Sequence, residues 1–234
     1  MKVIKPSITI KSSELKIGKL FTLERAARNC YKSEGKSKGT VDGASKFLKN
    51  IIKSGHESVL EHEKLTMSII TDRGQTHAIV RHRIASYSQE STIYCNYTNF
   101  DRFGKDILFV EPIFGDNQEA REHWKKACEI AETKYKDIIA IGGSPQQARS
   151  VLPTCVKTEI VITMNLRELR WFLLKRLDPI DHTSMHQLSI PLLMLCHKTW
   201  PVLFDDVLDR LNLNMAANKY KLLPEDYAEI IIND

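Results

Sequence analysis

Three consecutive residues that can carry positive charge, Arg81, His82 and Arg83, are the feature of this sequence that most directly suggests chemistry. Their neighbours Val80 and Ile84 are apolar. Partly buried cations are costly unless an anion lies against them, and the fork of a guanidinium group matches a phosphate in particular. Taken alone, such a run is better explained as the solvated basic end of a helix. Its surroundings must decide between the two interpretations.

The elements that would position this run form a mixed α and β pattern. Alternating apolar residues predict a strand over residues 64–71, which is followed by a helix over residues 73–84 that carries the run at its end. A second alternating strand is expected over residues 157–164. The remaining expected elements are a strand over 3–10, a polar loop over 32–40, and helices over 21–31, 43–54, 116–140, 145–152, 166–177, 182–198 and 201–211.

Two details of these helices can be checked directly. We expect the helix over residues 43–54 to begin with Asp42 as its N-cap and to stop at Gly55. The long helix over residues 116–140 is amphipathic, and its packed side is expected to comprise Trp124, Ala127, Ile130, Ala131, Tyr135 and Ile138.

Composition places the chain among globular proteins. It has 234 residues, of which 42% are apolar and 27% charged, with a mean hydropathy of -0.29. No apolar run approaches the roughly 20 residues that span a bilayer, and the first residues lack the pattern of a secretory signal. We therefore expect a single α+β domain over residues 1–234, located in the cytoplasm and without a membrane partner.

The charge and the cysteines exclude further classes. A net charge of +5 is too small and dispersed for a typical nucleic-acid-binding surface. Five scattered cysteines without a C-x-x-C motif argue against a disulfide framework and against a zinc site, so no metal is expected. The cysteines are expected to be buried thiols.

The sequence around the basic run is identified as similar to the flavin-dependent thymidylate synthases. In that family an arginine-histidine-arginine run is followed, after seven residues, by a serine, which here is Ser91. Further segments resemble family blocks in the same order, namely residues 24–33 (ERAARNCYKS), 55–62 (GHESVLEH), 72–74 (DRG), 148–153 (ARSVLP) and 165–170 (NLRELR).

The resemblance implies a fold and a reaction. The expected fold is of the ThyX type, α+β, with helices around an antiparallel or mixed sheet and active sites at subunit interfaces of a homotetramer. The expected reaction is the reductive methylation of dUMP to dTMP, with FAD as the cofactor and with NADPH and methylenetetrahydrofolate as co-substrates. Adding a carbon to the uracil ring places negative charge on the ring oxygens, which cationic donors would stabilise. The flavin would supply the hydride chemistry.

The resemblance also implies roles for individual residues. The flavin would be held by Ser58, Arg81, His82, Arg83 and His182. The residues that take part in catalysis would be His56, Ser91 and Arg167. The nucleotide would meet Ala78, Arg81, Gln89, Glu90, Ser91, Ile93, Arg167 and Met194. His62 and His77 are interpreted as structural, and Arg149 and Arg170 could either contact the substrate or form structural pairs.

Three of these nucleotide positions depart from the family pattern. Ile93 and Met194 stand where arginines are expected, and Ala78 stands where glutamine or glutamate is expected. Three interpretations follow. The chain could be an ordinary synthase in which Arg170, Lys175 or Arg176 replaces a missing donor, a flavin-dependent paralogue that acts on a different pyrimidine nucleotide, or a catalytically silent FAD-binding homologue.

Overall fold

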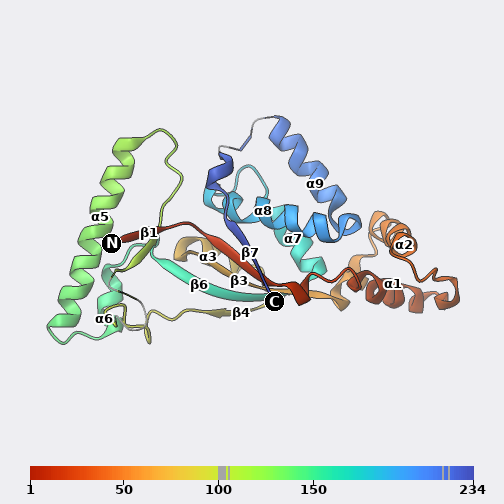
Figure 1. The fold of residues 1–234 in the computed structure, drawn as a ribbon, viewed down its shortest axis with the longest axis horizontal. Coiled ribbons are helices and arrows are strands. Elements are labelled where there is room, and N and C mark those ends of the chain that lie inside the picture. The colour runs from red at the N-terminus through yellow and green to blue at the C-terminus, as the bar shows by residue number, and fades with distance from the viewer. Residues whose placement is uncertain (100–103, 105, 218, 221) are drawn as a thin grey trace.

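The computed structural model describes residues 1–99, 104, 106–217, 219, 220 and 222–234. In this part of the chain, helices lie around a five-stranded mixed sheet, and a separate pair of strands lies at one end (Figure 1). The order of the large sheet is β4 (Ala85–Gln89), β6 (Lys157–Asn165), β3 (Lys64–Asp72), β2 (Ser7–Lys11) and β7 (Glu229–Asn233). The pair consists of β1 (Lys2–Ile4) and β5 (Leu108–Val110). None of the described helices is both long and apolar enough to cross a membrane.

The centre of the large sheet is the antiparallel pair of β3 and β6. The two strands pair over nine residues, from Lys64 opposite Asn165 to Asp72 opposite Lys157. Successive side chains of a strand point to opposite faces, and every second residue of β3 and β6 is buried. Both strands were expected from this alternation, and both are confirmed.

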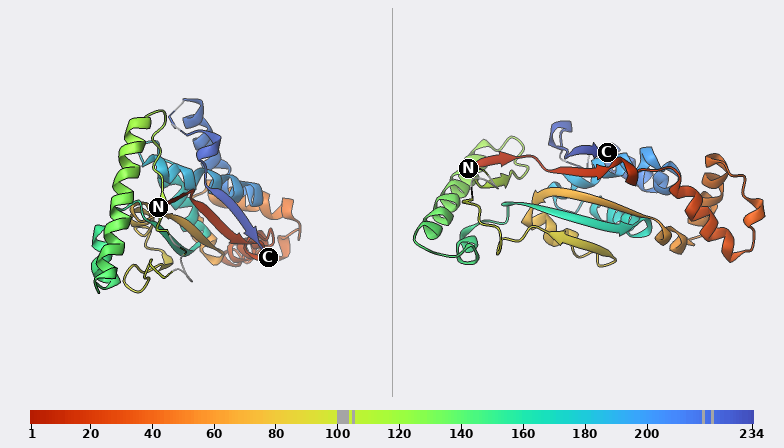
Figure 2. Two further views of the ribbon diagram at one scale, coloured as in Figure 1. Left: turned by 60° about the vertical axis from the view of Figure 1, so that its left-hand side comes forward. Right: turned by 60° about the horizontal axis from the view of Figure 1, so that its bottom comes forward.

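Helices occupy one face and both ends of the sheet. Figure 1 shows α7, α8 and α9 together over the sheet, α1 and α2 beyond one end, and α5 beyond the other. Figure 2 shows the same arrangement from two further sides. The bounds are α1 Lys19–Cys30, α2 Val41–Lys53, α3 Arg73–Ile79, α5 Gln118–Ala140, α6 Pro145–Ala148, α7 Leu166–Arg176, α8 Thr183–Thr199 and α9 Pro201–Ala216. The expected helices are therefore confirmed in type and approximate place, except that the one expected over residues 145–152 continues as a 3-10 turn after Ala148 and the one expected over residues 73–84 ends early.

The apolar side chains form two clusters. The larger fills the space between the sheet and the helices at α1, α2 and α7–α9, with Trp200 and Phe204 fully buried. The smaller joins α5 to β5 and α6 through Phe109, Cys128 and Tyr135. Burial of this apolar surface is the main force that fixes α5 against the rest of the chain.

Several sequence-based expectations about individual elements were wrong. The N-cap of α2 is Thr40, whose side chain accepts the Gly43 N–H, rather than Asp42. Ile130 and Ala127, both expected on the packed side of α5, are exposed, Ile130 by 62%. The chain does turn after α2 at Gly55, as expected, with a φ of +74° that glycine adopts without strain.

The largest correction concerns the segment that carries the basic run. Helix α3 ends at Ile79 instead of continuing to residue 84, and its Val80 N–H bonds the Thr76 carbonyl. Residues 85–89 instead form β4, an edge strand that pairs antiparallel with β6. The basic run therefore lies in the turn between a short helix and an edge strand, where the hydrogen bonds to β6 override the helical pattern.

The expected strand over residues 3–10 was correct in type but is divided. Its first part, β1, pairs with β5, and its second part, β2, pairs with β3 and β7. Pro6 lies between the two parts and cannot donate a ladder hydrogen bond.

Candidate functional site

The turn between α3 and β4 holds the basic run and is fastened by a tyrosine of β4. The hydroxyl of Tyr87 lies 3.1 Å from the Ile79 carbonyl and 2.5 Å from the His82 carbonyl, and it can donate to either. The His82 N–H donates to the Ile79 carbonyl. These contacts fix the backbone so that the His82 side chain points inward and those of Arg81 and Arg83 remain exposed.

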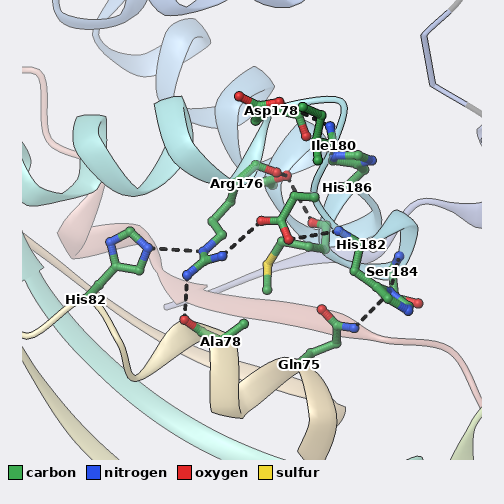
Figure 3. A network of polar contacts seen from close by, with 12 residues as sticks. Gln75, Ala78, His82, Arg176, Asp178, Ile180, His182, Ser184 and His186 are labelled. Atoms are coloured by element: carbon green, nitrogen blue, oxygen red, sulfur yellow. Dashed lines mark hydrogen bonds and ion pairs between the residues drawn. The ribbon is translucent and has the colours of Figure 1, made fainter.

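His82 is buried and is held between two charged partners. Its side chain packs edge-on against Phe172, and its Nδ1 lies 3.1 Å from Oε1 of Glu168. Its Nε2 lies 3.1 Å from Nε of Arg176 (Figure 3). Because a guanidinium only donates, Nε2 must be the unprotonated nitrogen, and Nδ1 then donates its hydrogen to Glu168. The ring is therefore neutral, with one tautomer selected by its neighbours.

Burial and the adjacent cation keep this histidine neutral. Burial and, after it, the charge of Arg176 together lower the pKa of His82 to about 4, whereas Asp181 acts in the opposite direction. Burial also raises the pKa of the Glu168 carboxyl. Both ring nitrogens of His82 are occupied by protein groups, so its expected contact with a flavin stays a prediction.

Arg176 joins three segments around this histidine. Besides His82, its guanidinium donates to the carbonyl of Ala78 at 2.7 Å and to Oδ2 of Asp181 at 3.0 Å. Figure 3 shows the guanidinium reaching from the end of α7 toward the end of α3. Arg176 therefore fixes the end of α3 against the loop that precedes α8, and it is not available as a replacement donor for a nucleotide.

A basic cleft of about 780 Å³ opens beside this network. Its lining contains four cations, three carboxylates that offset most of their charge, and apolar surface, contributed respectively by Arg81, Arg83, Lys175 and Arg176, by Glu168, Asp178 and Asp181, and by Trp171 and Ile180. Lys175 lies over the ring of Trp171 at 4.5 Å. Neither Arg81 nor Arg83 forms an ion pair with any residue that the structure describes. The cleft can therefore accept an anionic group with a flat apolar part.

His182 lies at the start of α8 and caps it. Its Nδ1 accepts the Ser184 N–H at 3.2 Å, and Nε2 of Gln75 lies 3.2 Å from the same nitrogen (Figure 3). Because Nδ1 accepts, the neutral ring carries its hydrogen on Nε2. The residue is exposed, so this N–H is available to a ligand.

His56, Ser58 and Arg167 are grouped near the opposite end of α7, and none of them lines the basic cleft. His56 and Ser58 are exposed at the start of the 3-10 helix η3 (Glu57–His62). The Nη1 of Arg167 lies 2.6 Å from Oε1 of Glu61, and both side chains are about half exposed. Such an exposed ion pair is weak and can be exchanged for a ligand.

The segment around η3 is held by Arg170. This fully buried guanidinium pairs with Oε1 of Glu57 at 3.1 Å and with both carboxylate oxygens of Asp206 at 2.8 and 2.9 Å, and it also donates to the Leu203 carbonyl. Arg170 is thus a structural residue that ties η3 to α9. Of the two alternatives open for Arg170, the structure favours structural pairing.

The expected nucleotide residues Gln89, Glu90 and Ser91 follow one another at the far end of β4. The amide of Gln89 donates to the Thr76 and Thr158 hydroxyls, and the carboxylate of Glu90 accepts from the Tyr97 hydroxyl and from Lys157. These bonds hold the strand end in place. The hydroxyl of Ser91 accepts the Ile93 N–H at 3.2 Å and can still donate to a ligand.

A second basic pocket, of about 450 Å³, adjoins this strand end. Arg73 and His77 enter it from α3, and Arg149 enters it from the 3-10 turn after α6. Nη1 of Arg149 donates to the hydroxyl of Thr92, which follows Ser91. Among the residues that the structure describes, none with a carboxylate lines this pocket, so its positive charge is not offset by them. From the sequence, no role was expected for Arg73, and His77 was expected to be structural.

The three departures from the family pattern do not gather at one point of this chain. Ile93 lies just beyond Ser91 and is 39% exposed, whereas Met194 lies on α8 and is 51% exposed. Ala78 is partly buried on α3, and its carbonyl accepts from Arg176. We call the cleft at Arg81 and Arg83 the first hollow and the pocket at Arg73 and Arg149 the second hollow. Neither Ile93 nor Met194 lines either of them.

Comparisons with known proteins agree with one another. The family model described as thymidylate synthase complementing protein matches residues 17–202. The flavin-dependent thymidylate synthase of Pyrococcus furiosus is 40% identical over 144 residues, which are 61% of this chain and 58% of that enzyme. The chain therefore aligns with less than two thirds of the Pyrococcus enzyme. The flavin-dependent thymidylate synthase of Geobacter sulfurreducens is 33% identical over 186 residues, 77% of this chain and 78% of that enzyme.

Two solved structures share the fold. The UMP/dUMP methylase PolB from Streptomyces cacaoi, bound with 5-Br dUMP, superposes with a TM-score of 0.71 at 18% identity over 95% of this chain and 100% of that chain. Thymidylate synthase X (ThyX) from Helicobacter pylori, with FAD and dUMP, superposes with a TM-score of 0.65 at 24% identity over 81% of this chain and 94% of that chain. The expected ThyX-type α+β fold is thereby confirmed.

Proposed function

This chain belongs to the flavin-dependent thymidylate synthase family, and from that premise we propose that it methylates dUMP to dTMP with FAD as its cofactor. Methylenetetrahydrofolate supplies the carbon and NADPH the reducing equivalents in this proposal. The observation that carries it is the pair of basic hollows at the two ends of β4. One contains the arginines of the signature, and the other adjoins its serine.

The residues of the first hollow fit a flavin nucleotide. Arg81 and Arg83 are exposed beside a cleft of about 780 Å³, and FAD carries a pyrophosphate that such guanidinium groups bind well. Trp171 and Ile180 offer apolar surface to a flat ring system. When bound there, FAD would supply the redox chemistry. The role of His82 in this proposal is to hold Arg176 and Glu168 in place, so that the turn keeps Arg81 and Arg83 directed at the cofactor.

The second hollow fits the phosphate of the nucleotide. Arg73, His77 and Arg149 line it, no carboxylate is among its described lining residues, and Ser91 precedes Thr92 at its edge. A phosphate accepts several charge-assisted hydrogen bonds at once. Arg149 and Arg73 would therefore provide the charge that Ile93 does not provide, and the serine hydroxyl would orient the nucleotide.

The distance between the hollows supports sites shared between subunits. The five residues of β4 cover about 16 Å at the usual rise of a strand, and His56, Ser58 and Arg167 lie near the start of α7, away from both hollows. A single chain therefore does not bring all the candidate residues around one substrate. We propose a homotetramer in which the first hollow of one subunit faces the second hollow of another.

A second candidate function is favoured by the three departures. Ala78, Ile93 and Met194 replace groups that could donate or accept hydrogen bonds. A pyrimidine nucleotide with a different ring substituent or sugar would need a different set of such groups. The candidate is therefore a flavin-dependent enzyme of the same fold that acts on another pyrimidine nucleotide.

Release of tritium from dUMP labelled at C5 tests the proposal. The protein is supplied with FAD, NADPH and methylenetetrahydrofolate, and the matched control omits methylenetetrahydrofolate. Tritium release together with dTMP in the complete mixture alone would support the proposed activity. A protein that binds FAD but releases no tritium would refute dUMP as the substrate, and the same assay with other pyrimidine nucleotides would then test the second candidate. A protein that takes up no FAD would refute both.

A further inference from the structure

Two cysteines that are 27 positions apart in the sequence lie close together in the smaller core cluster. Cys128 is on α5 and is buried, and Cys155 is in the loop before β6 and is partly exposed. Their sulfur atoms are 3.6 Å apart. A disulfide bond is about 2.05 Å long, so the two atoms need to approach by roughly 1.5 Å. A small rotation or loop shift can supply such a movement.

The five thiols of the chain do not share the environment expected from sequence. All five were expected to be buried, which was wrong for Cys30, which is exposed, and for Cys95 and Cys155, which are partly exposed. Cys196 is fully buried, and burial raises its pKa to about 12. Cys155 therefore combines access from solvent with a second thiol in contact.

The neighbours of Cys155 favour its thiolate form. The indole N–H of Trp124 lies 3.3 Å from its sulfur, and the thiol of Cys128 can donate to it as well. The hydrogen bond from Cys128 and that from Trp124 lower the pKa of Cys155, and the same contact with Cys155 raises the pKa of Cys128. The thiolate is the nucleophile in disulfide exchange, so the accessible cysteine is also the one prepared to attack.

From this geometry we propose that Cys128 and Cys155 form a reversible disulfide by exchange with a low-molecular-weight disulfide. The Cys155 thiolate attacks one sulfur of the small disulfide, whose S–S bond breaks, and the first small thiolate leaves and takes up a proton. Cys128 then loses its proton and attacks Cys155, which expels the second small thiol. Two protein thiols are oxidised to one disulfide, and the small disulfide is reduced to two thiols.

The loop that carries Cys155 also supports the second basic hollow. The carbonyls of Thr154 and Val156 accept the N–H groups of Gly74 and Arg73, where α3 begins. Thr154 and Val156 also line the hollow itself. A disulfide that draws Cys155 toward α5 would shift these two carbonyls and with them the base of the hollow. An effect of this shift on nucleotide binding rests on the proposed function, whereas the disulfide itself does not.

Mass spectrometry of the full chain tests the disulfide. The reduced protein is treated with oxidised glutathione, quenched with acid, unfolded, alkylated and digested, so that each cysteine is scored as free, mixed or paired. We expect the wild type to lose two hydrogens and to give a linked peptide containing Cys128 and Cys155. Cys128→Ser should accumulate a mixed disulfide at Cys155, and Cys155→Ser should leave Cys128 free. Cys196→Ser is the matched control and should pair as the wild type does.

The outcomes separate the disulfide from its consequence. Wild-type protein in which Cys155 stays free while Cys30 or Cys95 reacts would overturn the proposal, and so would a stable mixed disulfide at Cys155. Both of these overturning outcomes are scored in the wild type, so they do not depend on whether the serine variants fold. Binding of dUMP before and after oxidation is then measured in the wild type and in Cys128→Ser. A disulfide that leaves the affinity for dUMP unchanged would refute only the link to the hollow.

Discussion

Neutral, buried His82 should make the stability of this protein depend on pH between pH 7 and pH 5. Its ring is held between Glu168 and Arg176, and burial together with the charge of Arg176 lowers its pKa to about 4. In the unfolded chain the pKa returns to its ordinary value of 6.5. Between these two values the unfolded chain binds more protons than the folded chain, so the free energy of unfolding falls as the pH falls.

The size of the effect follows from the difference between the two pKa values. The difference of 2.5 (6.5 minus 4) corresponds to about 3 kcal/mol at 1.36 kcal/mol for each pKa unit. About 2 kcal/mol of this should be lost between pH 7 and pH 5. Glu168 acts in the opposite sense, because burial raises its pKa and the folded chain then retains a proton at acidic pH that the unfolded chain has released. The wild-type profile alone therefore does not isolate His82.

Comparing the wild type with two variants isolates the contribution of His82 to the pH dependence. Urea unfolding is measured at pH 7, 6 and 5 and at one fixed protein concentration for the wild type, His82→Asn and His123→Asn. The asparagine at position 82 keeps a donor for Glu168 but does not titrate, so its free energy of unfolding should fall by about 2 kcal/mol less than that of the wild type between pH 7 and pH 5. His123 is exposed on α5, and its variant should follow the wild type. Parallel profiles for the wild type and His82→Asn would refute the assignment of a neutral His82.

Three further substitutions test other parts of the structure. Arg149→Gln removes a cation from the second hollow and should weaken dUMP binding about tenfold to a hundredfold, as expected for the loss of one charge-assisted hydrogen bond. The control Lys126→Gln, on α5, should bind dUMP as the wild type does. Equal affinities of Arg149→Gln and the wild type in calorimetry would contradict the assignment of the phosphate to this hollow. Arg170→Met leaves two carboxylates without their buried partner and should lower the free energy of unfolding by about 3 kcal/mol. Lys134→Met, which removes only an exposed ion pair, should lower it by less than about 1 kcal/mol. Urea unfolding measures both changes. Ile93→Arg should tighten dUMP binding about tenfold, and weaker binding would favour a different nucleotide.

The central part of the fold could be predicted from local patterns. Residues 64–71 and 157–164 alternate over most of their length, and they form β3 and β6, because a half-buried strand favours that alternation. The long helix over residues 118–140 was equally clear from its periodicity and length. These elements depend mainly on information within their own segments.

Elements that depend on distant partners were not predictable in the same way. Residues 85–89 gave no strong strand signal, and they form β4 because the edge of β6 is available to them. Strand β7 pairs with β2, and the two lie more than 200 positions apart in the chain. Such pairings come from the tertiary fold, which overrides weak local preferences.

In the candidate site, too, the residues within one segment could be found from the sequence, and their distant partners could not. The signature from Arg81 to Ser91 could be found by spacing, and the structure places it in one turn and one strand. Glu168 and Arg176 were not recognised as partners of His82, from which they are 86 and 94 positions distant. Arg73 and Arg149 likewise meet only in the folded chain. A possible signal was the four-residue spacing of Arg73 and His77, which places both on one face of a helix.

The contacts of the arginines bear on which interpretation of the three departures is correct. An ordinary synthase needs donors that replace the missing arginines. Arg170 and Arg176 do not qualify, because each is already engaged by several acceptors. Lys175 lies over the ring of Trp171 in the first hollow and does not line the second. Arg149 does qualify, since its bond to the neutral Thr92 hydroxyl can be exchanged for a stronger one to a phosphate. Arg73 also lines the hollow, with its Nη1 donating to the Glu90 carbonyl and the Thr158 hydroxyl, and none of the described lining residues carries a carboxylate, so the hollow keeps a positive charge near Ile93. In the function proposed here, phosphate recognition therefore rests on arginines other than those of the family pattern, and the ring of the nucleotide, rather than its phosphate, is the part whose recognition Ala78 and Met194 would change.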